Sequence, residues 1–440
     1  MAKGRMLSGF VCFLAFAVFY TLTARTELQV SDEVATFATG MSLVTQNDLA
    51  IDELQWLQDA VGIGKRGPDG HLYAKYFPGN VIGSAILYQL APFPVGDPFF
   101  WNGKEIAPSL ARARFAMLLD PLFGALAMTL LWLWTERAHS ARVAWTVVVA
   151  LGVGSDWWYQ SRGFMSEVGA GMFLVACAYL AYSRRPYLSA LALGLAVLFR
   201  PTSLLGMPIW FVSLRPDDGP GRGWRWRDLG SVGLVVAGVI GLGVYNWLRY
   251  GAPTDFGYVN ETFNWSWLGL WGVLLSPARS PLVYAPVLAL AIPGAWWYSR
   301  QERWVTLALV TTSVAHILTI GSWHSWAGGW TWGMRLLTPI VPLLAVLCAA
   351  ALARITKDWR GWALVSVLCV WGFGAAAMGL ARDPIRTLNE RVGPDKVPFD
   401  DTLYTLERSQ FVLQYQSLQT WTPCDVDARL LRGLIGACAP

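Results

Sequence analysis

The chain has 440 residues, of which 55% are hydrophobic and 14% are charged, and its formal net charge is +5. This composition excludes an ordinary water-soluble protein and predicts an all-α polytopic membrane protein. The positive net charge does not indicate a nucleic-acid partner, because the basic residues stand between apolar segments and form no basic domain.

Apolar segments long enough to cross a membrane recur along the chain. A span needs about 20 apolar residues, and we predict about eleven spans, at 6–23, 112–134, 143–158, 165–183, 187–199, 201–214, 229–248, 281–298, 304–320, 335–353 and 361–381. The segments 187–199 and 201–214 are short arms that meet at Arg200-Pro201. We expect them to form a hairpin, because a proline inside one continuous helix is unfavourable.

The distribution of Lys and Arg predicts the orientation of these spans. Cytoplasmic segments carry an excess of basic residues, and a cytoplasmic N-terminus places all of the clustered ones on that side. They are Lys3, Arg5, Arg137, Arg142, Arg184, Arg185, Arg215, Arg222, Arg225, Arg227, Arg300, Arg303, Arg354, Lys357 and Arg360. The C-terminus is then outside. A cleaved signal peptide at 6–23 is an alternative that leaves the downstream topology unchanged.

Two outer regions are expected on this topology. Residues 1–381 form a transmembrane domain, and its first outer loop, 24–111, contains helix candidates at 33–44 and, lying in the membrane interface, at 80–92. Residues 382–440 form an outer tail. Its Cys424 and Cys438 could pair if the tail faces an oxidising compartment, a question that the sequence leaves open.

The acidic pair Asp32-Glu33 lies just outside the first predicted span, at the start of a helix. Such carboxylates often serve only to cap the helix or to face its dipole. The outer side, however, also contains basic residues that the orientation rule disfavours there. The outer charged residues and histidine of interest are Lys75, Arg162, Glu167, Arg200, Arg279, His324 and Arg335.

A bound anion explains these outer cations, and the phosphate of a polyprenyl lipid is a natural candidate. If that phosphate carries a sugar, it leaves readily and needs cationic stabilisation. One carboxylate then suffices to take the proton from an acceptor hydroxyl, and a direct displacement inverts the anomeric centre. The alternatives are a transporter or flippase of a lipid-linked sugar and a non-catalytic scaffold of the cell envelope. A transporter favours matching halves with broken helices, and only the pair at Arg200-Pro201 is broken in this way.

The chain resembles the GT-C class of integral-membrane glycosyltransferases, in particular the polyprenyl-phosphate-dependent protein mannosyltransferases and lipid A aminoarabinose transferases. The acidic pair of that class matches Asp32-Glu33. Its K-P-P turn matches YAKYFPG at Lys75 and Pro78 and departs from it at Phe77.

Five further segments carry the resemblance. GLAVLFRPTSLL and YNWLRYGAPTDFGY are similar to segments common among bacterial proteins of this kind. SRGFMSE places Glu167 where relatives often have Asp, while LLSPARSPLVYAPVLAL and WAGGWTWGMRLLTPIVPLL place Arg279 and Arg335 near the donor site. The resemblance implies GT-C architecture and an enzyme of the bacterial inner membrane. Such an enzyme moves a sugar from a polyprenyl-phosphate carrier to a lipid, glycan or protein acceptor at the periplasmic face.

The resemblance also implies roles for individual residues. Asp32 stands in the position of the catalytic base, with Glu33 beside it, and Lys75, Arg279 and Arg335 neutralise the donor phosphate. Glu167, near Arg162, positions the acceptor or a divalent metal such as Mg²⁺ or Mn²⁺. Candidates for stacking on a sugar or a prenyl chain are Trp323, His324, Trp326 and Trp330. The sugar, the acceptor, the metal requirement and the assembly state are not specified.

Overall fold

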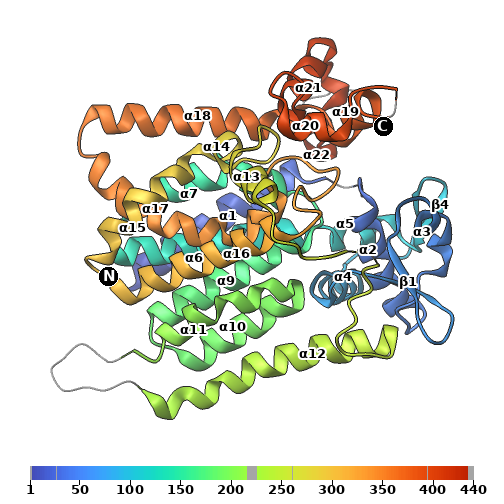
Figure 1. Ribbon diagram of the computed structural model, residues 1–440, viewed down its shortest axis with the longest axis horizontal. Coiled ribbons are helices and arrows are strands. Elements are labelled where there is room, and N and C mark those ends of the chain that lie inside the picture. The colour runs from blue at the N-terminus through green and yellow to red at the C-terminus, as the bar shows by residue number, and fades with distance from the viewer. Residues whose placement is uncertain (1, 26, 216–224, 260, 394, 435–440) are drawn as a thin grey trace.

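The computed structural model describes residues 2–25, 27–215, 225–259, 261–393 and 395–434. It is a bundle of helices that lie roughly side by side, with smaller elements gathered at one end (Figure 1). The bundle contains α1 (Ala2–Thr23), α5 (Leu110–Ala116), α6 (Leu119–Ala138), α7 (Ala141–Gly152), α8 (Asp156–Ser161), α9 (Ser166–Tyr182), α10 (Pro186–Phe199), α11 (Met207–Val212), α12 (Val232–Tyr250), α13 (Trp267–Leu275), α14 (Pro281–Tyr284), α15 (Ala291–Ser299), α16 (Arg303–Ser322), α17 (Val341–Ile355) and α18 (Trp359–Ala381). Short 3₁₀ helices join some of them: η2 (Pro201–Gly206), η3 (Trp226–Ser231), η4 (Pro286–Leu290) and η5 (Arg335–Ile340).

The predicted spans are helical, and they fall into two classes. Within the described part of the chain, six helices are long and apolar enough to cross a membrane: Gly4–Thr23, Leu110–Ala138, Asp228–Tyr250, Arg303–Ser322, Arg335–Ile355 and Trp359–Ala381. The shorter apolar helices are Ala141–Gly152, Ser166–Tyr182, Pro186–Phe199 and Pro201–Val212. The predicted span 281–298 is not one helix, because it breaks at Ala285-Pro286 into α14, η4 and α15. The prediction of an all-α, multi-pass membrane protein is confirmed.

The segments that share a predicted side of the membrane lie at the same end of the bundle. At the end where α1 begins, Arg5 pairs with Glu136, and Arg215 pairs with Glu302 at 3.3 Å. Nη1 of Arg184 donates to the carbonyl oxygen of Arg215 at 2.8 Å, so the arms α10 and α11 return to the end from which α10 starts. The hairpin is thus present, while the direction in which the bundle faces across the membrane stays a prediction.

The first outer segment is more structured than the sequence predicted. It contains α2 (Ser31–Thr45), η1 (Asp52–Leu54), α3 (Gln55–Val61), α4 (Pro78–Leu90) and two antiparallel hairpins, β1 (Gly64–Arg66) with β2 (Leu72–Ala74) and β3 (Phe99–Trp101) with β4 (Lys104–Ala107). The hairpins were not predicted, since each strand has only three or four residues. Asn102 and Gly103 form the β3–β4 turn with positive φ angles of 47° and 76°, as a tight hairpin turn requires.

Helices α2 and α4 pack closely in this segment. A Cβ atom at Gly40 of α2 would lie 2.5 Å from Oγ of Ser84 and 2.9 Å from the carbonyl oxygen of Val81, both in α4. The glycine therefore permits the close approach that fixes α2, and with it the acidic pair at the start of α2.

The tail is helical and packs against the bundle. It contains α19 (Pro384–Arg391), α20 (Phe399–Tyr404), α21 (Gln410–Ser417), η6 (Leu418–Thr420), η7 (Pro423–Asp425) and α22 (Arg429–Leu434). Phe411 of α21 stacks on Trp332 and on Trp371 of α18. Cys438 lies outside the described residues, so its pairing with Cys424 stays a prediction, as does the domain boundary at residue 382.

Candidate active site

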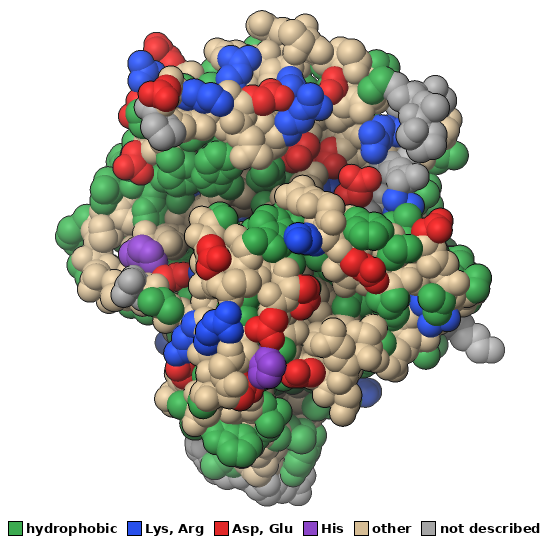
Figure 2. All heavy atoms as spheres, turned by 90° about the vertical axis from the view of Figure 1, so that its right-hand side faces the viewer, with side chains coloured by type: hydrophobic (Ala, Val, Ile, Leu, Met, Phe, Trp, Pro, Cys, Tyr) green, Lys and Arg blue, Asp and Glu red, His purple; other side chains and the backbone are tan. Residues whose placement is uncertain are grey.

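A cavity of about 990 Å³ opens at the end of the bundle that carries the first outer segment and the tail. Its walls come from four parts of the chain, at 27–32, 75–77, 323–336 and 382–432, with single residues from other helices and loops. Figure 2 shows this end of the molecule, on which acidic and basic side chains gather around a recess. Of the residues predicted from sequence, Asp32, Lys75, Trp323, Trp330 and Arg335 line the cavity.

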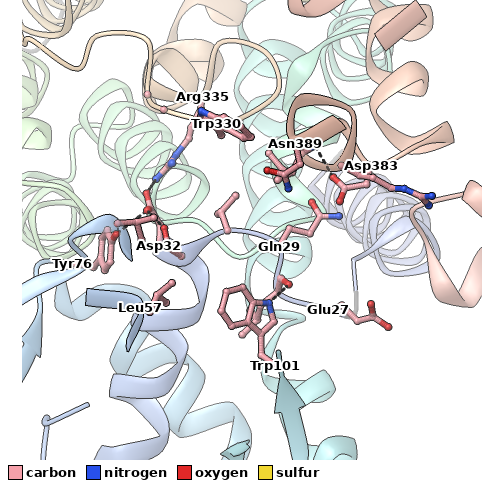
Figure 3. Close-up of a pocket in the computed structure, with 18 of the residues that line it drawn as sticks. Glu27, Gln29, Asp32, Leu57, Tyr76, Trp101, Trp330, Arg335, Asp383 and Asn389 are labelled. Carbon is pink, nitrogen blue, oxygen red and sulfur yellow. Dashed lines mark hydrogen bonds and ion pairs between the residues drawn. The ribbon is translucent and has the colours of Figure 1, made fainter. Parts of the chain in front are cut away.

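Asp32 is presented to the cavity by the first turn of α2. Its Oδ1 accepts a hydrogen bond of 2.7 Å from the hydroxyl of Tyr76, and its Oδ2 accepts one of 3.0 Å from Nη2 of Arg335 (Figure 3). Burial alone would raise the pKa of Asp32, but the charge of Arg335 and the Tyr76 hydrogen bond outweigh it, so the pKa is lowered. The side chain is still 29% exposed. Asp32 is therefore an ionised carboxylate that a ligand in the cavity can reach.

Arg335 is held in place by Glu167. Oε1 of Glu167 accepts from Nε of Arg335 at 2.7 Å and from Nη1 of Arg200 at 2.6 Å. Glu167 itself is fully buried and does not line the cavity, whereas both of its arginine partners do. The planar guanidinium of Arg335 thus bridges Glu167 and Asp32, which fixes its orientation. Glu167 positions two cations, a role that the sequence did not assign to it.

Lys75 faces the same part of the cavity from the loop before α4. Its Nζ lies 2.8 Å from Oε1 of Glu261 and 5.2 Å from the centre of the Tyr258 ring. Pro78 at the first turn of α4 fixes where this helix begins, and so fixes the loop that carries Lys75 and Tyr76. Tyr258 and Glu261 come from the loop after α12 and also line the cavity.

The sequence reasoning assigned no role to Tyr76, Arg200, Tyr258 or Glu261, although all four line the cavity. Arg200 belonged to the set of outer cations, and Tyr76 follows Lys75 directly, so both could have been included. Tyr258 ends the segment YNWLRYGAPTDFGY, which carries the family resemblance but gave neither Tyr258 nor Glu261 a role.

Glu33, predicted to act beside Asp32, does not belong to the cavity wall, and its contacts are to other parts of the protein. It is 1% exposed and pairs with Arg25 at 2.8 Å. It also accepts from the backbone N–H groups of Gln29 at 2.8 Å and Phe164 at 3.3 Å. Since its oxygens are occupied by protein donors, Glu33 joins the first outer segment to the turn before α9.

Arg279, predicted to neutralise the donor phosphate, is likewise not among the residues that line the cavity. Its guanidinium donates to the carbonyl oxygens of Ala327 at 2.7 Å and Gly329 at 2.9 Å and to the side chain of Gln410 in the tail. These bonds hold the loop that precedes Arg335. Arg279 therefore stabilises a loop of the cavity wall without reaching the cavity itself.

Arg162 also turns away from the cavity. Nε of Arg162 donates to the carbonyl oxygen of Thr23 at 2.8 Å, and Nη2 reaches Oδ2 of Asp427 at 2.8 Å. Because Thr23 ends α1 and Asp427 belongs to the tail, Arg162 joins the two, and its predicted role in positioning an acceptor or a metal stays a prediction.

The predicted stacking residues separate into two pairs. Trp323 and Trp330 line the cavity. Trp326 does not, because its ring packs against α13, where a Cβ atom at Gly272 would lie 2.3 Å from it. His324 is exposed outside the cavity, and its Nε2 lies 3.0 Å from Oγ of Ser325.

The turn before Arg335 depends on Gly333. This residue has a φ of 72°, and a Cβ atom there would lie 2.3 Å from Oδ1 of Asp156. Oδ2 of Asp156 accepts from the backbone N–H of Met334 at 3.1 Å. Asp156 and the turn are therefore in direct contact, with no space for a side chain at position 333.

We expect Gly333→Ala to lower the free energy of unfolding by at least about 1 kcal/mol, from backbone strain and from displacement of Asp156. Thermal unfolding in detergent measures this loss. Gly329→Ala is the matched control, since Gly329 also has a positive φ, of 70°, but a Cβ atom there meets nothing within 4 Å. Equal losses in the two variants would contradict a role for the Asp156 contact.

Side chains that could bind a metal ion are not clustered in the described ranges. Among these residues, no three His, Cys, Asp or Glu side chains are placed so that they could hold a metal ion. Glu167, the acid that the resemblance offered to a metal, contacts Arg200 and Arg335 instead.

Known proteins resemble this chain in structure and not in sequence. No family model and no curated protein sequence matches it. ArnT from Cupriavidus metallidurans in the apo state matches with a TM-score of 0.54 and 15% identity, over 98% of this chain and 75% of that one. ArnT from the same organism bound to undecaprenyl phosphate matches with a TM-score of 0.54 and 16% identity, over 98% of this chain and 77% of that one. At such identities the likeness shows the fold alone, and this chain has the GT-C membrane protein fold that ArnT has.

Proposed function

We propose that the protein transfers a sugar from a polyprenyl-phosphate carrier to a hydroxyl group of an acceptor, at the periplasmic face of a bacterial inner membrane. The observation that carries this proposal is the convergence of Asp32 with Lys75, Arg200 and Arg335 on one cavity. A reachable carboxylate next to several cations provides a base for the acceptor and neutralisation for a leaving phosphate. The solved ArnT complex with undecaprenyl phosphate supports a carrier of this class.

The donor phosphate would bind among the three cations. Arg200 is 8% exposed, and its Nε makes no hydrogen bond to any described residue. An unpaired buried N–H group is costly, and a phosphate oxygen would satisfy it. Lys75 and Arg335 each keep further N–H donors beyond the bonds that they make to carboxylates.

The reaction is a single displacement in this proposal. The acceptor oxygen forms a bond to the anomeric carbon while the bond from that carbon to the phosphate oxygen breaks. The electron pair of the broken bond leaves with polyprenyl phosphate, and the acceptor proton passes to Asp32. One displacement inverts the configuration of the anomeric carbon.

Donor binding would also prepare the base. In the free protein Arg335 lowers the pKa of Asp32, which makes the carboxylate a weak base. A bound phosphate would partly neutralise Arg335 and so weaken its attraction for the Asp32 carboxylate. The pKa of Asp32 therefore rises when the donor is present. This coupling favours binding of the donor before proton transfer from the acceptor.

Binding of the carrier tests the proposal without knowledge of the sugar. We expect Lys75→Ala to weaken binding of undecaprenyl phosphate by about ten- to a hundredfold, because a hydrogen bond to a charged group is lost. Titration by native mass spectrometry measures the affinity. Lys65→Ala is the matched control: Lys65 also pairs with a carboxylate, Asp255, and lies over a tyrosine ring, but it is not in the cavity. Unchanged binding in Lys75→Ala, or an equal loss in Lys65→Ala, would contradict this phosphate site.

The sugar and any metal requirement follow from a second measurement. Purified protein incubated with a panel of polyprenyl-phosphate sugars, with and without Mg²⁺ or Mn²⁺, would identify the donor by turnover.

A further inference from the structure

The cavity continues well beyond the proposed donor phosphate. Its second part, which we call the outer half, lies between the segment 27–31, the β3–β4 hairpin and the tail. In Figure 3 the side chains of Gln29, Asp383 and Asn389 point toward one another across this half, and Trp101 lies below them. The whole cavity has about 990 Å³, at the upper limit of a typical pocket of roughly 300–1,000 Å³ for one small ligand. A cavity of this volume can hold two ligands only if each needs a pocket near the lower end of that range, as a sugar unit does.

Trp101 offers a fixed aromatic surface at the tip of the hairpin. Its indole N–H donates to the carbonyl oxygen of Leu28 at 2.9 Å, and its ring stacks on Trp56 at 5.8 Å with an interplanar angle of 28°. Both contacts hold the ring in one orientation. A rigid aromatic side chain of this kind provides a large contact area at low entropic cost.

Polar groups in the outer half are free to bind a ligand. The side-chain amide of Asn389 makes no hydrogen bond to the rest of the described chain, and the amide nitrogen of Gln29 makes none either. One oxygen of Asp383 accepts from the backbone N–H of Ile385 at 2.9 Å, and the other has no donor among the described residues. Amides donate and accept, whereas a carboxylate only accepts, so the ligand must itself donate hydrogen bonds.

An anionic ligand is disfavoured in the outer half. Arg382 lies 2.8 Å from Glu390, and Arg386 lies 3.0 Å from Glu390 and 3.6 Å from Asp425. Arg432 donates to the carbonyl oxygen of Cys424 at 3.3 Å. This half is lined by these three arginines and by four carboxylates, those of Glu27, Asp383, Asp425 and Asp427, so the acids outnumber the cations. A phosphate or carboxylate would meet these acids and could not donate to Asp383.

We propose that the outer half is the acceptor subsite and takes a neutral glycan, with Trp101 under a sugar ring and Gln29, Asp383 and Asn389 bound to its hydroxyl groups. This proposal rests on the proposed glycosyl transfer and specifies its acceptor. The wall 29–32 leads from the subsite to the base. Three residues of extended chain span at most about 11 Å, so a glycan bound at Gln29 can present its terminal hydroxyl to Asp32.

Glycan binding can be measured apart from transfer. Protein in phosphatidylcholine nanodiscs, which avoid glycoside detergents, would be titrated with neutral trisaccharides of glucose, mannose and arabinose and with trigalacturonic acid as the anionic probe. Saturation-transfer NMR reports the binding. We expect at least one neutral trisaccharide to bind, and to bind at least tenfold more tightly than trigalacturonic acid.

Point variants distinguish glycan binding in the outer half from phosphate binding at the donor site. Trp101→Ala should weaken trisaccharide binding at least tenfold while undecaprenyl phosphate binds as before, and Trp101→Phe should retain most of the affinity. Asn389→Ala, at an exposed position that folding tolerates, should weaken trisaccharide binding as well. The Asp32→Asn variant should leave it unchanged.

Three results would overturn the subsite. They are no binding of any neutral trisaccharide, binding of trigalacturonic acid that is as tight or tighter, and full affinity in both Trp101→Ala and Asn389→Ala. Failure of the wild-type protein to bind undecaprenyl phosphate would instead overturn the proposed function.

Discussion

Replacing Asp32 with Asn is expected to reduce sugar transfer by about a hundred- to ten-thousandfold, the usual contribution of a positioned general base. Asn has nearly the same shape and can still accept from Tyr76 and Arg335, but it cannot take the acceptor proton. The fold should therefore be retained, and undecaprenyl phosphate should bind at least as tightly as to the wild-type protein, because Asn no longer competes for the charge of Arg335. Single-turnover assays with the identified donor measure the chemical step, and thermal unfolding checks the fold.

The pH profile gives the same variant a second test. Asp32 acts in its ionised form and its pKa is lowered in the free protein, so kcat/KM should stay constant through the neutral range and fall only in acid. In the Asp32→Asn variant, the residual kcat/KM should not show this fall at acidic pH. Transfer at the wild-type rate in this variant would contradict Asp32 as the base. If the wild-type protein instead moves the intact donor across a vesicle membrane without consuming it, the protein is a transporter.

Replacing the neighbouring Glu33 with Gln is expected to act on stability, with a loss of about 3–5 kcal/mol in the free energy of unfolding. Removal of one member of a buried ion pair leaves the other charge uncompensated, and Arg25 is itself 7% exposed. Unfolding in mixed detergent and SDS micelles measures the loss. Glu27→Gln is the control, because Glu27 is exposed and close in sequence.

The two neighbouring variants should therefore fail in different ways. Asp32→Asn gives a stable protein that binds the carrier and does not transfer sugar, whereas Glu33→Gln gives a protein that unfolds easily. A stable Glu33→Gln protein with no activity would instead indicate that Glu33 takes part in catalysis.

The membrane fold could be predicted because it depends on composition along short stretches of sequence. Apolar segments and the distribution of basic residues were enough to locate the helices and to group their connections at two ends. The hairpin β3–β4 was not predictable in this way, since strands as short as Phe99–Trp101 carry no pattern. The breaks inside 281–298 depend on how prolines are accommodated by neighbouring helices.

The site could be predicted only in part, for a geometric reason. Asp32, Lys75 and Arg335 stood out as charges on the outer side, and the structure brings them to one cavity. Adjacent residues of a helix point about 100° apart, so Asp32 reaches the cavity and Glu33 the interior. Arg200 and Arg279 were both outer arginines, and only long-range packing decides that Arg200 faces the cavity while Arg279 binds backbone carbonyl groups.

The bonds from the tail to the bundle have a consequence for biosynthesis. Gln410 contacts Arg279 and donates to the carbonyl oxygen of Thr331 at 2.7 Å, and Asp427 contacts Arg162. The loops around the base are thus completed by residues that the ribosome adds only after α18. A nascent chain with every span already inserted still lacks a finished cavity, so the cavity is complete only once the tail has folded onto the bundle.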